Sequence, residues 1–243
     1  MGQTNLRLDK LIASQCGLSR KEARLAIRSG RVQVNGESEN NIAKSIYPEK
    51  DQVMLDGQAV YYKKHLYLLM NKPAGVLSAS NDAKRQTVVD LVPEKLRRDG
   101  LFPVGRLDKD TTGLLIITDD GDFAHEVIAP KKRVPKSYLV QLDGILTEEM
   151  PEKFRQGIVL ADGTPCRPAK LEILAPDRAR LILCEGKYHE VKRMFGTVGL
   201  GVVSLHRESL GDLFLPDELK PGETVEMDGK MVLSAKSTGQ YTF

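Results

Sequence analysis

The sequence has few cysteines, no long apolar run and no glycine-rich phosphate loop. Its three cysteines, Cys16, Cys166 and Cys184, are too widely spaced for the paired ligands of a zinc site, and their odd number argues against a disulfide framework. No apolar stretch approaches the roughly 20 residues that a transmembrane helix needs. The segment Met1-Gly2-Gln3-Thr4-Asn5 lacks the basic and apolar regions of a secretory signal. We therefore expect free thiols and a cytoplasmic protein.

Missing motifs also limit the chemistry. The sequence contains neither a Walker-type phosphate loop nor the glycine motif of dinucleotide-binding folds. The pair His189-Glu190 has no second matching pair that would complete a metal site. We expect no cofactor and no metal. The composition of the 243 residues, 41% hydrophobic and 28% charged, suits a soluble protein with an ordinary core.

Positive charge is concentrated near the start of the chain. The net charge is +3, but residues 1–36 hold seven basic and two acidic side chains, which makes this segment +5 and the rest −2. A small basic module joined to a nearly neutral body is a common arrangement for binding the phosphate backbone of a nucleic acid. A basic face that only meets solvent would have the same composition, so composition alone leaves both interpretations open.

The same segment predicts two helices followed by a hairpin. Residues 8–12 place their apolar side chains on one helical face, and Ser19 with Glu22 forms the capping box of a second, basic helix. Gly30 suits the end of that helix. Asn35-Gly36 is a strong signal for a tight turn after a short strand.

These segments resemble the S4 RNA-binding domain over residues 6–52. The matching stretches are Leu6-Arg7-Leu8-Asp9-Lys10, Ser19-Arg20-Lys21-Glu22-Ala23 and Gly30-Arg31-Val32-Gln33-Val34-Asn35-Gly36. In that family the two helices and the adjacent loop face RNA, so the resemblance implies RNA contacts from the basic residues of this segment. These residues are Arg7, Lys10, Arg20, Lys21, Arg24, Arg28 and Arg31.

The rest of the chain predicts an α+β body. Residues 53–65 indicate a connector, and a core strand is expected at 66–70. Later strands are expected near 114–118, 134–142, 168–175, 178–184 and, as the last one, 202–206. Helices are expected near 87–97, after Asp119-Asp120, around 147–156 and at 188–198. Strands in runs, with helices between only some of them, favour a mainly antiparallel sheet with flanking helices.

One polar, turn-rich stretch directly precedes an apolar strand. It reads Gly105-Arg106-Leu107-Asp108-Lys109-Asp110-Thr111-Thr112-Gly113 and continues into Leu114-Leu115-Ile116-Ile117. A loop held by a rigid strand is a good position for a reactive side chain, and Asp108 is the candidate. A carboxylate here also suits the capping of a turn, so the residues alone leave both roles open.

Two further stretches bear basic residues. In Lys131-Lys132-Arg133-Val134-Pro135-Lys136-Ser137-Tyr138-Leu139-Val140 a basic loop enters a strand. This pattern suits phosphate contacts with base stacking on Tyr138, and equally a tyrosine that packs in the core. In Cys184-Glu185-Gly186-Lys187-Tyr188-His189-Glu190-Val191-Lys192-Arg193-Met194-Phe195 a strand ends and a helix begins, with Lys192 and Arg193 as site residues or as solvated charges.

Taken in order, these stretches resemble the motifs of pseudouridine synthases, and more narrowly those of the RsuA type. The shared motifs are Asn71-Lys72-Pro73-Ala74-Gly75, residues 105–113, Lys136-Ser137-Tyr138-Leu139-Val140 and residues 185–194. The resemblance implies an isomerase that breaks the bond between ribose and uracil, turns the base and rejoins it through carbon. We place an S4-like RNA-binding domain at 1–56, a linker at 57–65 and a pseudouridine synthase catalytic domain at 66–243.

The resemblance also implies roles for residues. Asp108 is expected to be the essential carboxylate, which either acts on the sugar as the glycosidic bond loosens or first removes a proton from the ribose. Lys192 is expected to keep that carboxylate charged, and Tyr138 to stack on the target base and help remove a proton from its carbon. Arg106 is expected to help take the uridine out of its stack. Further RNA contacts are expected from Lys72, Lys131, Lys132, Arg133, Lys136 and Arg193.

Two positions depart from the family pattern, and they bear on the substrate. Glu190 stands where glutamine is frequent, which we expect to add negative charge near the RNA surface, and Ser137 stands where threonine is frequent. Tyr188-His189 resembles enzymes for small-subunit ribosomal RNA, whereas large-subunit enzymes tend to carry arginine and glutamine at positions 189 and 190. We expect a monomer that modifies small-subunit ribosomal RNA. The alternatives are a large-subunit substrate and an S4-type RNA-binding protein without activity.

Overall fold

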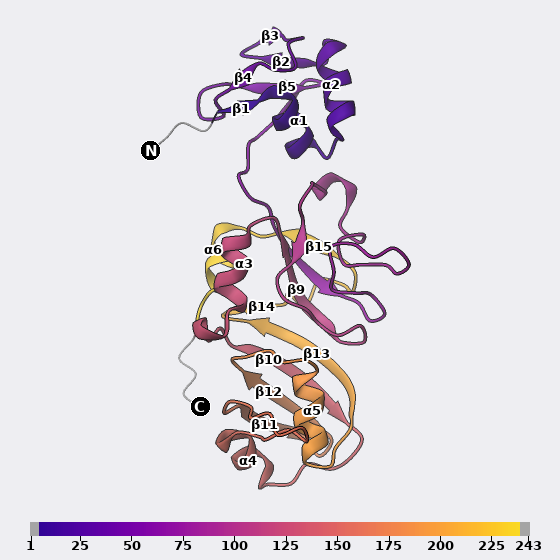
Figure 1. Cartoon of the computed structure of the whole chain (residues 1–243), viewed down its shortest axis with the longest axis vertical. Helices are drawn as coiled ribbons and strands as arrows, with labels where there is room; N and C mark the ends of the chain where they lie inside the picture. Colours follow the sequence, from indigo (N-terminus) through magenta and orange to yellow (C-terminus); the bar gives the residue numbers. More distant parts are fainter. Residues whose placement is uncertain (1–4, 239–243) are drawn as a thin grey trace. The chain divides into compact units, whose positions relative to one another are not determined.

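The computed structural model describes residues 5–238, which divide into two compact units (Figure 1). The first unit extends to Leu66 and also takes in Val92–Leu101, and the second comprises Tyr67–Leu91 and the chain from Phe102 onward. Residues 1–4, which contribute to the cytoplasmic expectation, lie outside the described range. Across residues 5–238, no helix has both the length and the apolar character needed to cross a membrane.

The N-terminal unit contains two helices and two small sheets. Its elements are β1 (Leu6–Arg7), α1 (Leu8–Cys16), α2 (Arg20–Arg28), β2 (Val32–Val34), β3 (Glu37–Ser38), β4 (Ser45–Ile46), β5 (Val53–Leu55), β6 (Gln58–Ala59) and the 3₁₀ turn η1 (Glu94–Leu96). Antiparallel strands run in the order β3-β2-β5-β6, and β1 pairs with β4. Apolar side chains of α1, such as Leu8 and Ile12, pack with Ile27 of α2 and Val32 of β2 into one core.

Most local predictions for this unit are confirmed. Ser19 caps α2, and its side chain and that of Glu22 form the reciprocal capping box. Gly30 adopts a left-handed conformation (φ +74°) directly after the helix, and Asn35 and Gly36 both have positive φ (55° and 86°), as a type I′ hairpin requires.

The prediction of a connector at 53–65 is wrong for its first part. Strands β5 and β6 lie there, because Val53 and Leu55 pair with β2 and pack against the same core. Such strands of two or three residues are too short to produce a visible alternation in the sequence. The domain bounds at 56 and 66 stay a prediction.

The second unit is built on one large sheet. Its elements are β7 (Tyr67–Lys72), β8 (Phe102–Pro103), β9 (Thr112–Thr118), α3 (Gly121–Ile128), η2 (Pro130–Lys132), β10 (Lys136–Leu142), α4 (Met150–Gln156), β11 (Lys170–Ala175), β12 (Arg178–Leu183), α5 (Glu190–Thr197), β13 (Val202–Leu210), β14 (Leu213–Phe214), β15 (Thr224–Glu226) and α6 (Gly229–Ser234). The main path is β11-β12-β10-β13-β9-β7-β15, with β14 beside β13 and β8 beside β9. The expected mixed fold with a mainly antiparallel sheet is confirmed.

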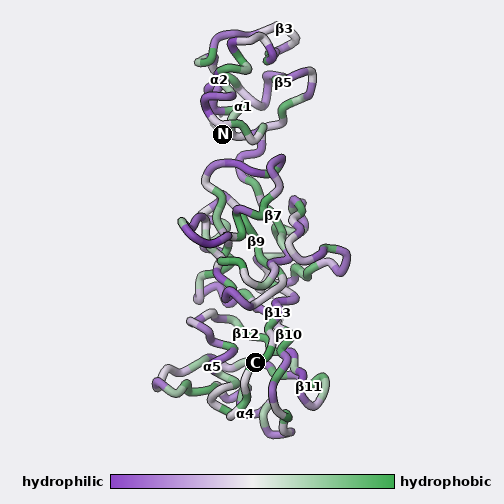
Figure 2. Tube along the Cα trace, turned by 90° about the vertical axis from the view of Figure 1, so that its right-hand side faces the viewer, coloured by the Kyte–Doolittle hydropathy of each residue, from purple (hydrophilic) through white to green (hydrophobic). Residues whose placement is uncertain are grey.

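Helices α3 and α6 lie side by side over one part of the sheet (Figure 1). Lys236, just after α6, donates a hydrogen bond of 2.7 Å to Glu126 of α3. Phe123 and Val127 of α3 belong to a core cluster with Leu114 of β9. The central strands β7 and β9 are largely apolar, as their green colour in Figure 2 shows, because both are covered by other parts of the unit.

A single parallel pairing is present among the strand ladders of residues 5–238, between β9 and β13, and it depends on a glycine. A Cβ atom on Gly113 would lie 2.3 Å from the carbonyl oxygen of Arg207, and its φ of +102° also favours glycine. The close approach of the two strands fixes the loop that precedes Gly113, which is the loop of Asp108.

Two sequence predictions for this unit are corrected. Residues 87–97 do not form a helix: Asp90 accepts hydrogen bonds from the backbone N–H and the hydroxyl of Thr87 in a turn, and only the 3₁₀ turn η1 follows Pro93. The strand expected as the last one extends to Leu210, and β14 and β15 follow it. Both are short, and β15 pairs with β7 far away in the sequence, so no local pattern reveals them.

Candidate active site

Asp108 lies in a turn between β8 and β9 that is held on several sides. The Thr111 N–H donates to the Asp108 carbonyl at 3.1 Å, which closes the turn. The hydroxyl of Ser78 donates to the carbonyl of Leu107 at 2.8 Å and accepts from the Leu107 N–H at 3.1 Å. These contacts fix the backbone on both sides of the Asp108 side chain, as a reactive group requires.

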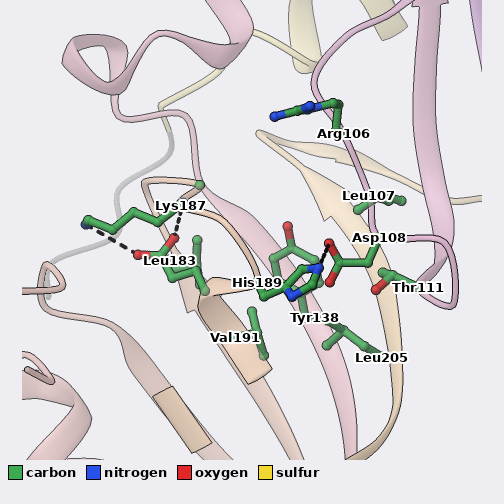
Figure 3. A pocket seen from close by; sticks show the side chains of 12 residues that line it. Arg106, Leu107, Asp108, Thr111, Tyr138, Leu183, Lys187, His189, Val191 and Leu205 are labelled. Carbon is green, nitrogen blue, oxygen red and sulfur yellow. Dashed lines mark hydrogen bonds and ion pairs between the residues drawn. The ribbon is translucent and has the colours of Figure 1, made fainter. Parts of the chain in front are cut away.

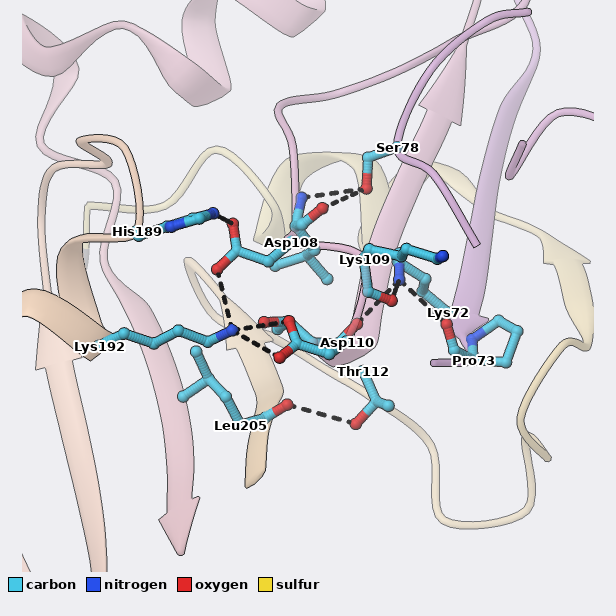
Figure 4. Close-up of polar contacts among 12 residues, drawn as sticks. Lys72, Pro73, Ser78, Asp108, Lys109, Asp110, Thr112, His189, Lys192 and Leu205 are labelled. Carbon is cyan, nitrogen blue, oxygen red and sulfur yellow. Dashed lines mark hydrogen bonds and ion pairs between the residues drawn. The ribbon is translucent and has the colours of Figure 1, made fainter. Parts of the chain in front are cut away.

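Lys72 holds the same turn through hydrogen bonds to its backbone (Figure 4). Its side chain is fully buried, and its Nζ donates to the carbonyls of Pro73, Lys109 and Thr111 at 3.0, 3.2 and 2.9 Å. Burial lowers the pKa of Lys72 to about 8, although the nearby Asp110 and Asp108 favour the charged form. The prediction that Lys72 contacts phosphate is therefore wrong, because its ammonium group is buried and donates its hydrogen bonds to backbone carbonyls.

The Asp108 carboxylate, 25% exposed, is approached by two side chains from the start of α5. Nε2 of His189 lies 3.4 Å from Oδ1, and Nζ of Lys192 lies 3.7 Å from Oδ2 (Figure 4). Lys192 makes its shorter bonds to Asp110, at 2.7 Å to both oxygens, and the hydrogen bond holds the pKa of Asp110 below its usual value. One lysine thus bridges the two carboxylates of the loop.

Tyr138 lies opposite this loop in a pocket that the sheet supports (Figure 3). Leu183, Tyr138 and Leu205 come from the adjacent strands β12, β10 and β13. Tyr138 is only 8% exposed, and the ladder between β10 and β13 is irregular directly before it. The structure therefore brings together Asp108, Tyr138 and Lys192, the three residues that the sequence singles out.

Other cationic side chains near the pocket differ in accessibility. Arg106 lines the pocket and is exposed. The cluster Lys131, Lys132 and Arg133 is exposed in the loop before β10, and Arg193 pairs with Asp162. Arg106 and the three residues of the loop are open to solvent, and their RNA contacts stay a prediction, as does that of Arg193.

Lys136 does not fit that expectation. It is 8% exposed, and its Nζ donates to the carbonyl of Val134 at 2.8 Å. Burial lowers the pKa of Lys136 to about 8, and the charge of Arg207 acts in the same direction. The predicted phosphate contact is wrong for this residue, since its charged end lies inside the unit.

The expectation for Glu190 is also corrected. Its side chain is buried rather than on an RNA surface, beside Glu185 and Cys166. Burial raises the pKa of Glu190, and the Glu185 carboxyl adds to the rise. The pKa of Glu185 is lowered instead, because hydrogen bonds from Glu190 and Lys187 outweigh its own burial. Of the two carboxyls, Glu190 is therefore the one whose protonated form the fold favours.

The group of Cys166, Glu185 and Glu190 has the donor atoms of a metal site, yet a cation is already there. Lys187 hydrogen-bonds to Glu185 and lies 3.5 Å from Glu190. Burial raises the pKa of the Cys166 thiol to about 11, which disfavours the thiolate a metal needs. All three cysteines are free thiols, as predicted.

In the N-terminal unit, part of the predicted RNA surface has partners of its own. Arg7 and Arg24 both donate to the fully buried carboxylate of Asp9, at 3.1 and 3.0 Å. Burial alone would raise the pKa of Asp9, but these two hydrogen bonds hold it below its usual value. Arg31 pairs with Asp56. The remaining predicted contacts are exposed, and they are Lys10, Arg20, Lys21 and Arg28.

The sequence interpretation missed the part that His189 and Asp110 take in this site. Asp110 lay inside a recognised motif, but nothing in the sequence showed that it binds Lys192 across 82 residues. The i, i+3 spacing of His189 and Lys192 at a helix start was the available signal, since it places both side chains on one face.

The sequence matches two known family models and several known proteins. Residues 66–197 match the family model for RNA pseudouridylate synthase, and residues 6–45 match the model for the S4 domain. The ribosomal small subunit pseudouridine synthase A of Escherichia coli (strain K12) is 41% identical over 90% of this chain and 94% of its own length. A protein of Bacillus subtilis (strain 168) called uncharacterized RNA pseudouridine synthase YtzG is 42% identical over 91% of this chain and 95% of its own length.

A solved structure agrees with these matches. A crystal structure of pseudouridylate synthase is 37% identical, covers 95% of this chain and 99% of its own, and superposes with a TM-score of 0.67. The resemblance to RsuA-type pseudouridine synthases with an S4 domain is confirmed. The chain belongs to the RNA pseudouridine synthase family and is an enzyme of that family.

Proposed function

We propose that this enzyme converts a uridine of small-subunit ribosomal RNA to pseudouridine, with Asp108 as the catalytic carboxylate. The observation that carries the proposal is the setting of Asp108: a rigidly held, partly exposed carboxylate at a pocket, with Lys192 and His189 within 4 Å and Tyr138 opposite. A nearby cation favours the ionised form that either nucleophilic attack on the ribose or proton removal from it requires.

Three other residues at or beside the pocket have separate roles in the proposed reaction. Tyr138 offers a ring on which the uracil can stack after it leaves the RNA helix, and its hydroxyl is available to help remove the proton from the carbon that joins the ribose. Arg106, at the open side of the pocket, is suited to fill the space that the uridine vacates (Figure 3). Lys192 places its positive charge beside Asp108, and Asp110 holds the lysine in that position.

Phosphate contacts come from both units. In the catalytic unit, the exposed loop of Lys131, Lys132 and Arg133 precedes the strand of Tyr138. In the S4 unit, the exposed side chains of Lys10, Arg20, Lys21, Arg24 and Arg28 lie on or beside the two helices. Each such contact is expected to strengthen binding and its salt dependence with little effect on the chemical step.

The choice of small-subunit RNA rests on the relatives and on Tyr188-His189. Several relatives at about 40% identity carry the name ribosomal small subunit pseudouridine synthase A. Such a substrate implies that the enzyme works in the cytoplasm, and we expect it to do so as a monomer. Large-subunit ribosomal RNA is the alternative substrate.

Pseudouridine mapping of ribosomal RNA tests the proposal. Cells with the wild-type protein, cells without it and cells with Asp108→Asn are compared at every uridine. Loss of one small-subunit site in the last two strains is expected. Loss of a large-subunit site instead would keep the enzyme and overturn the substrate. A complete set of modifications in the Asp108→Asn strain would overturn the role of Asp108.

A further inference from the structure

His189 has an unusual backbone conformation at the edge of the active site. Its φ and ψ are 48° and 35°, the left-handed region that side-chain-bearing residues seldom adopt. It sits directly before α5 and lines the pocket. Strained backbone conformations persist only where the surrounding structure maintains them, and they cluster at functional sites. The conformation of His189 therefore points to a role at this site.

The conformation turns the imidazole toward the carboxylate of Asp108 (Figure 3). Nε2 of His189 lies 3.4 Å from Oδ1, and Lys192, one helical turn further on, lies 3.7 Å from Oδ2. The first turn of α5 therefore reaches both oxygens of one carboxylate. The 3.4 Å separation is longer than a charge-assisted hydrogen bond, and catalytic hydrogen bonds are often long until the substrate is bound.

A second ring keeps the imidazole in place. The ring of Tyr188 stacks on that of His189, with centroids 3.8 Å apart and planes at 22°. Tyr188 itself is 73% exposed, so its packing contributes little to the core and its ring serves mainly as a support for its neighbour. The stacked pair limits the rotation of the His189 side chain about its own bonds.

We propose that His189 is a positioning residue for the catalytic carboxylate: it restrains Oδ1 of Asp108 while Lys192 approaches Oδ2. The inference rests on the proposed function, in which Asp108 performs the chemistry. The charged or titratable groups around the imidazole come from two elements besides its own segment, the loop before β9 and strand β10. They are Asp108 and Asp110 of the loop, Arg106 at the pocket, Tyr138 of β10, and Lys187, Glu190 and Lys192 of its own segment.

Single-turnover kinetics on purified full-length enzyme test this. The probe is a transcript of small-subunit ribosomal RNA labelled with tritium at C5 of uridine, since that hydrogen is released when the new bond forms. Wild type, His189→Ala, His189→Gln and Asp108→Asn are compared under the same conditions, and RNA dissociation constants are measured in parallel. His125→Ala, which removes an exposed histidine of α3, is the matched control, and thermal melting verifies folding.

His189→Ala is expected to slow the chemical step by about 10- to 100-fold, the usual effect of a misplaced reacting group, with little change in RNA affinity. His189→Gln, which keeps a hydrogen-bond donor at this position, is expected to recover most of the rate. An unchanged rate in both variants, a loss in His189→Gln as large as that in His189→Ala, or weaker RNA binding at an unchanged rate would overturn the inference alone. Wild-type turnover by Asp108→Asn would overturn the proposed function and this inference with it.

Discussion

Lys72 permits a quantitative test of how the active-site loop is held. Methionine has a similar length and lacks the three donors that Lys72 directs at carbonyl oxygens. After Lys72→Met, the carbonyl of Lys109 still accepts a hydrogen bond from the Gly75 N–H at 2.7 Å. The carbonyls of Pro73 and Thr111 lose the hydrogen bonds that Lys72 donates to them. Each carbonyl left without a donor costs about 1–3 kcal/mol, and this cost is partly offset because methionine buries no charge. The free energy of unfolding is therefore expected to fall by about 2–4 kcal/mol.

Urea denaturation and single-turnover kinetics measure the two sides of this prediction. The free energy of unfolding is expected to fall by that amount, and the rate of the chemical step by about 10-fold or more because the Asp108 turn loosens. RNA affinity and its salt dependence are expected to stay the same, since Lys72 has no exposed surface. Lys109→Met, on the exposed side of the same loop, is the control for stability and is expected to change it by less than about 0.5 kcal/mol.

The opposite pattern refutes the reasoning. If Lys72→Met left the stability unchanged and reduced the salt dependence of RNA binding, Lys72 would be a phosphate ligand, as the sequence first indicated. The loop would then owe its geometry to other contacts, such as those of Ser78.

Three further predictions concern other buried features. The pKa of Glu190 is raised in the folded state, so its protonated form stabilises the fold at low pH, and this stabilisation is lost as the pH rises through the folded-state pKa. Glu190→Gln is therefore expected to raise the free energy of unfolding more at pH 7 than at pH 4 in urea denaturation. An equal change at both pH values would contradict this. The pKa of Asp9 is lowered in the folded state, so its carboxylate stabilises the fold at neutral pH. Asp9→Asn is expected to lower the free energy of unfolding by about 1–3 kcal/mol at pH 7, and by less as the pH falls below about 4. A loss that does not depend on pH in thermal melts would be evidence against this. Gly113→Ala places a side chain at a positive φ and against Arg207, and is expected to lower the free energy of unfolding by about 2–6 kcal/mol. Gly57→Ala is the control, because Gly57 has a positive φ but no atom near its Cβ position, and it is expected to lower this free energy clearly less. Equal losses in chemical denaturation would rule out the close approach of the strands as the cause.

Local signals in the sequence predicted local structure well. The capping box of Ser19 and Glu22 and the turn of Asn35-Gly36 depend on residues at most three positions apart, so neighbouring residues determine them. The helix after Asp120 begins where its carboxylate accepts two backbone N–H bonds, which is the same kind of signal. The short strands β6 and β15 depend on pairing partners, and the sequence did not show them.

The burial of charged residues was the main feature that the sequence could not reveal. Lys72 and Lys136 stand within basic or polar motifs, and their type predicts exposure. The acceptors that satisfy Lys72 include a carbonyl 39 residues away, so only the fold shows that this lysine points inward. Glu190 is likewise buried beside Glu185 and Lys187, and burial raises its pKa.

The site itself was predicted in part. The family resemblance identified Asp108, Tyr138 and Lys192, and the fold brings their three elements to one pocket. The contact of His189 with Asp108 was not predicted, because it requires a left-handed backbone that residues other than glycine seldom adopt.

The central claim, that the Asp108 carboxylate carries out the isomerisation, is tested most directly by tritium release in a single turnover with purified enzyme and ribosomal RNA. Asp108→Asn keeps the size of the side chain and removes its charge, and Asp217→Asn provides a control at an exposed aspartate outside the pocket. The account predicts no detectable tritium release from Asp108→Asn, with RNA affinity within about threefold of wild type, and normal release from Asp217→Asn. Release by Asp108→Asn at the wild-type rate would contradict it.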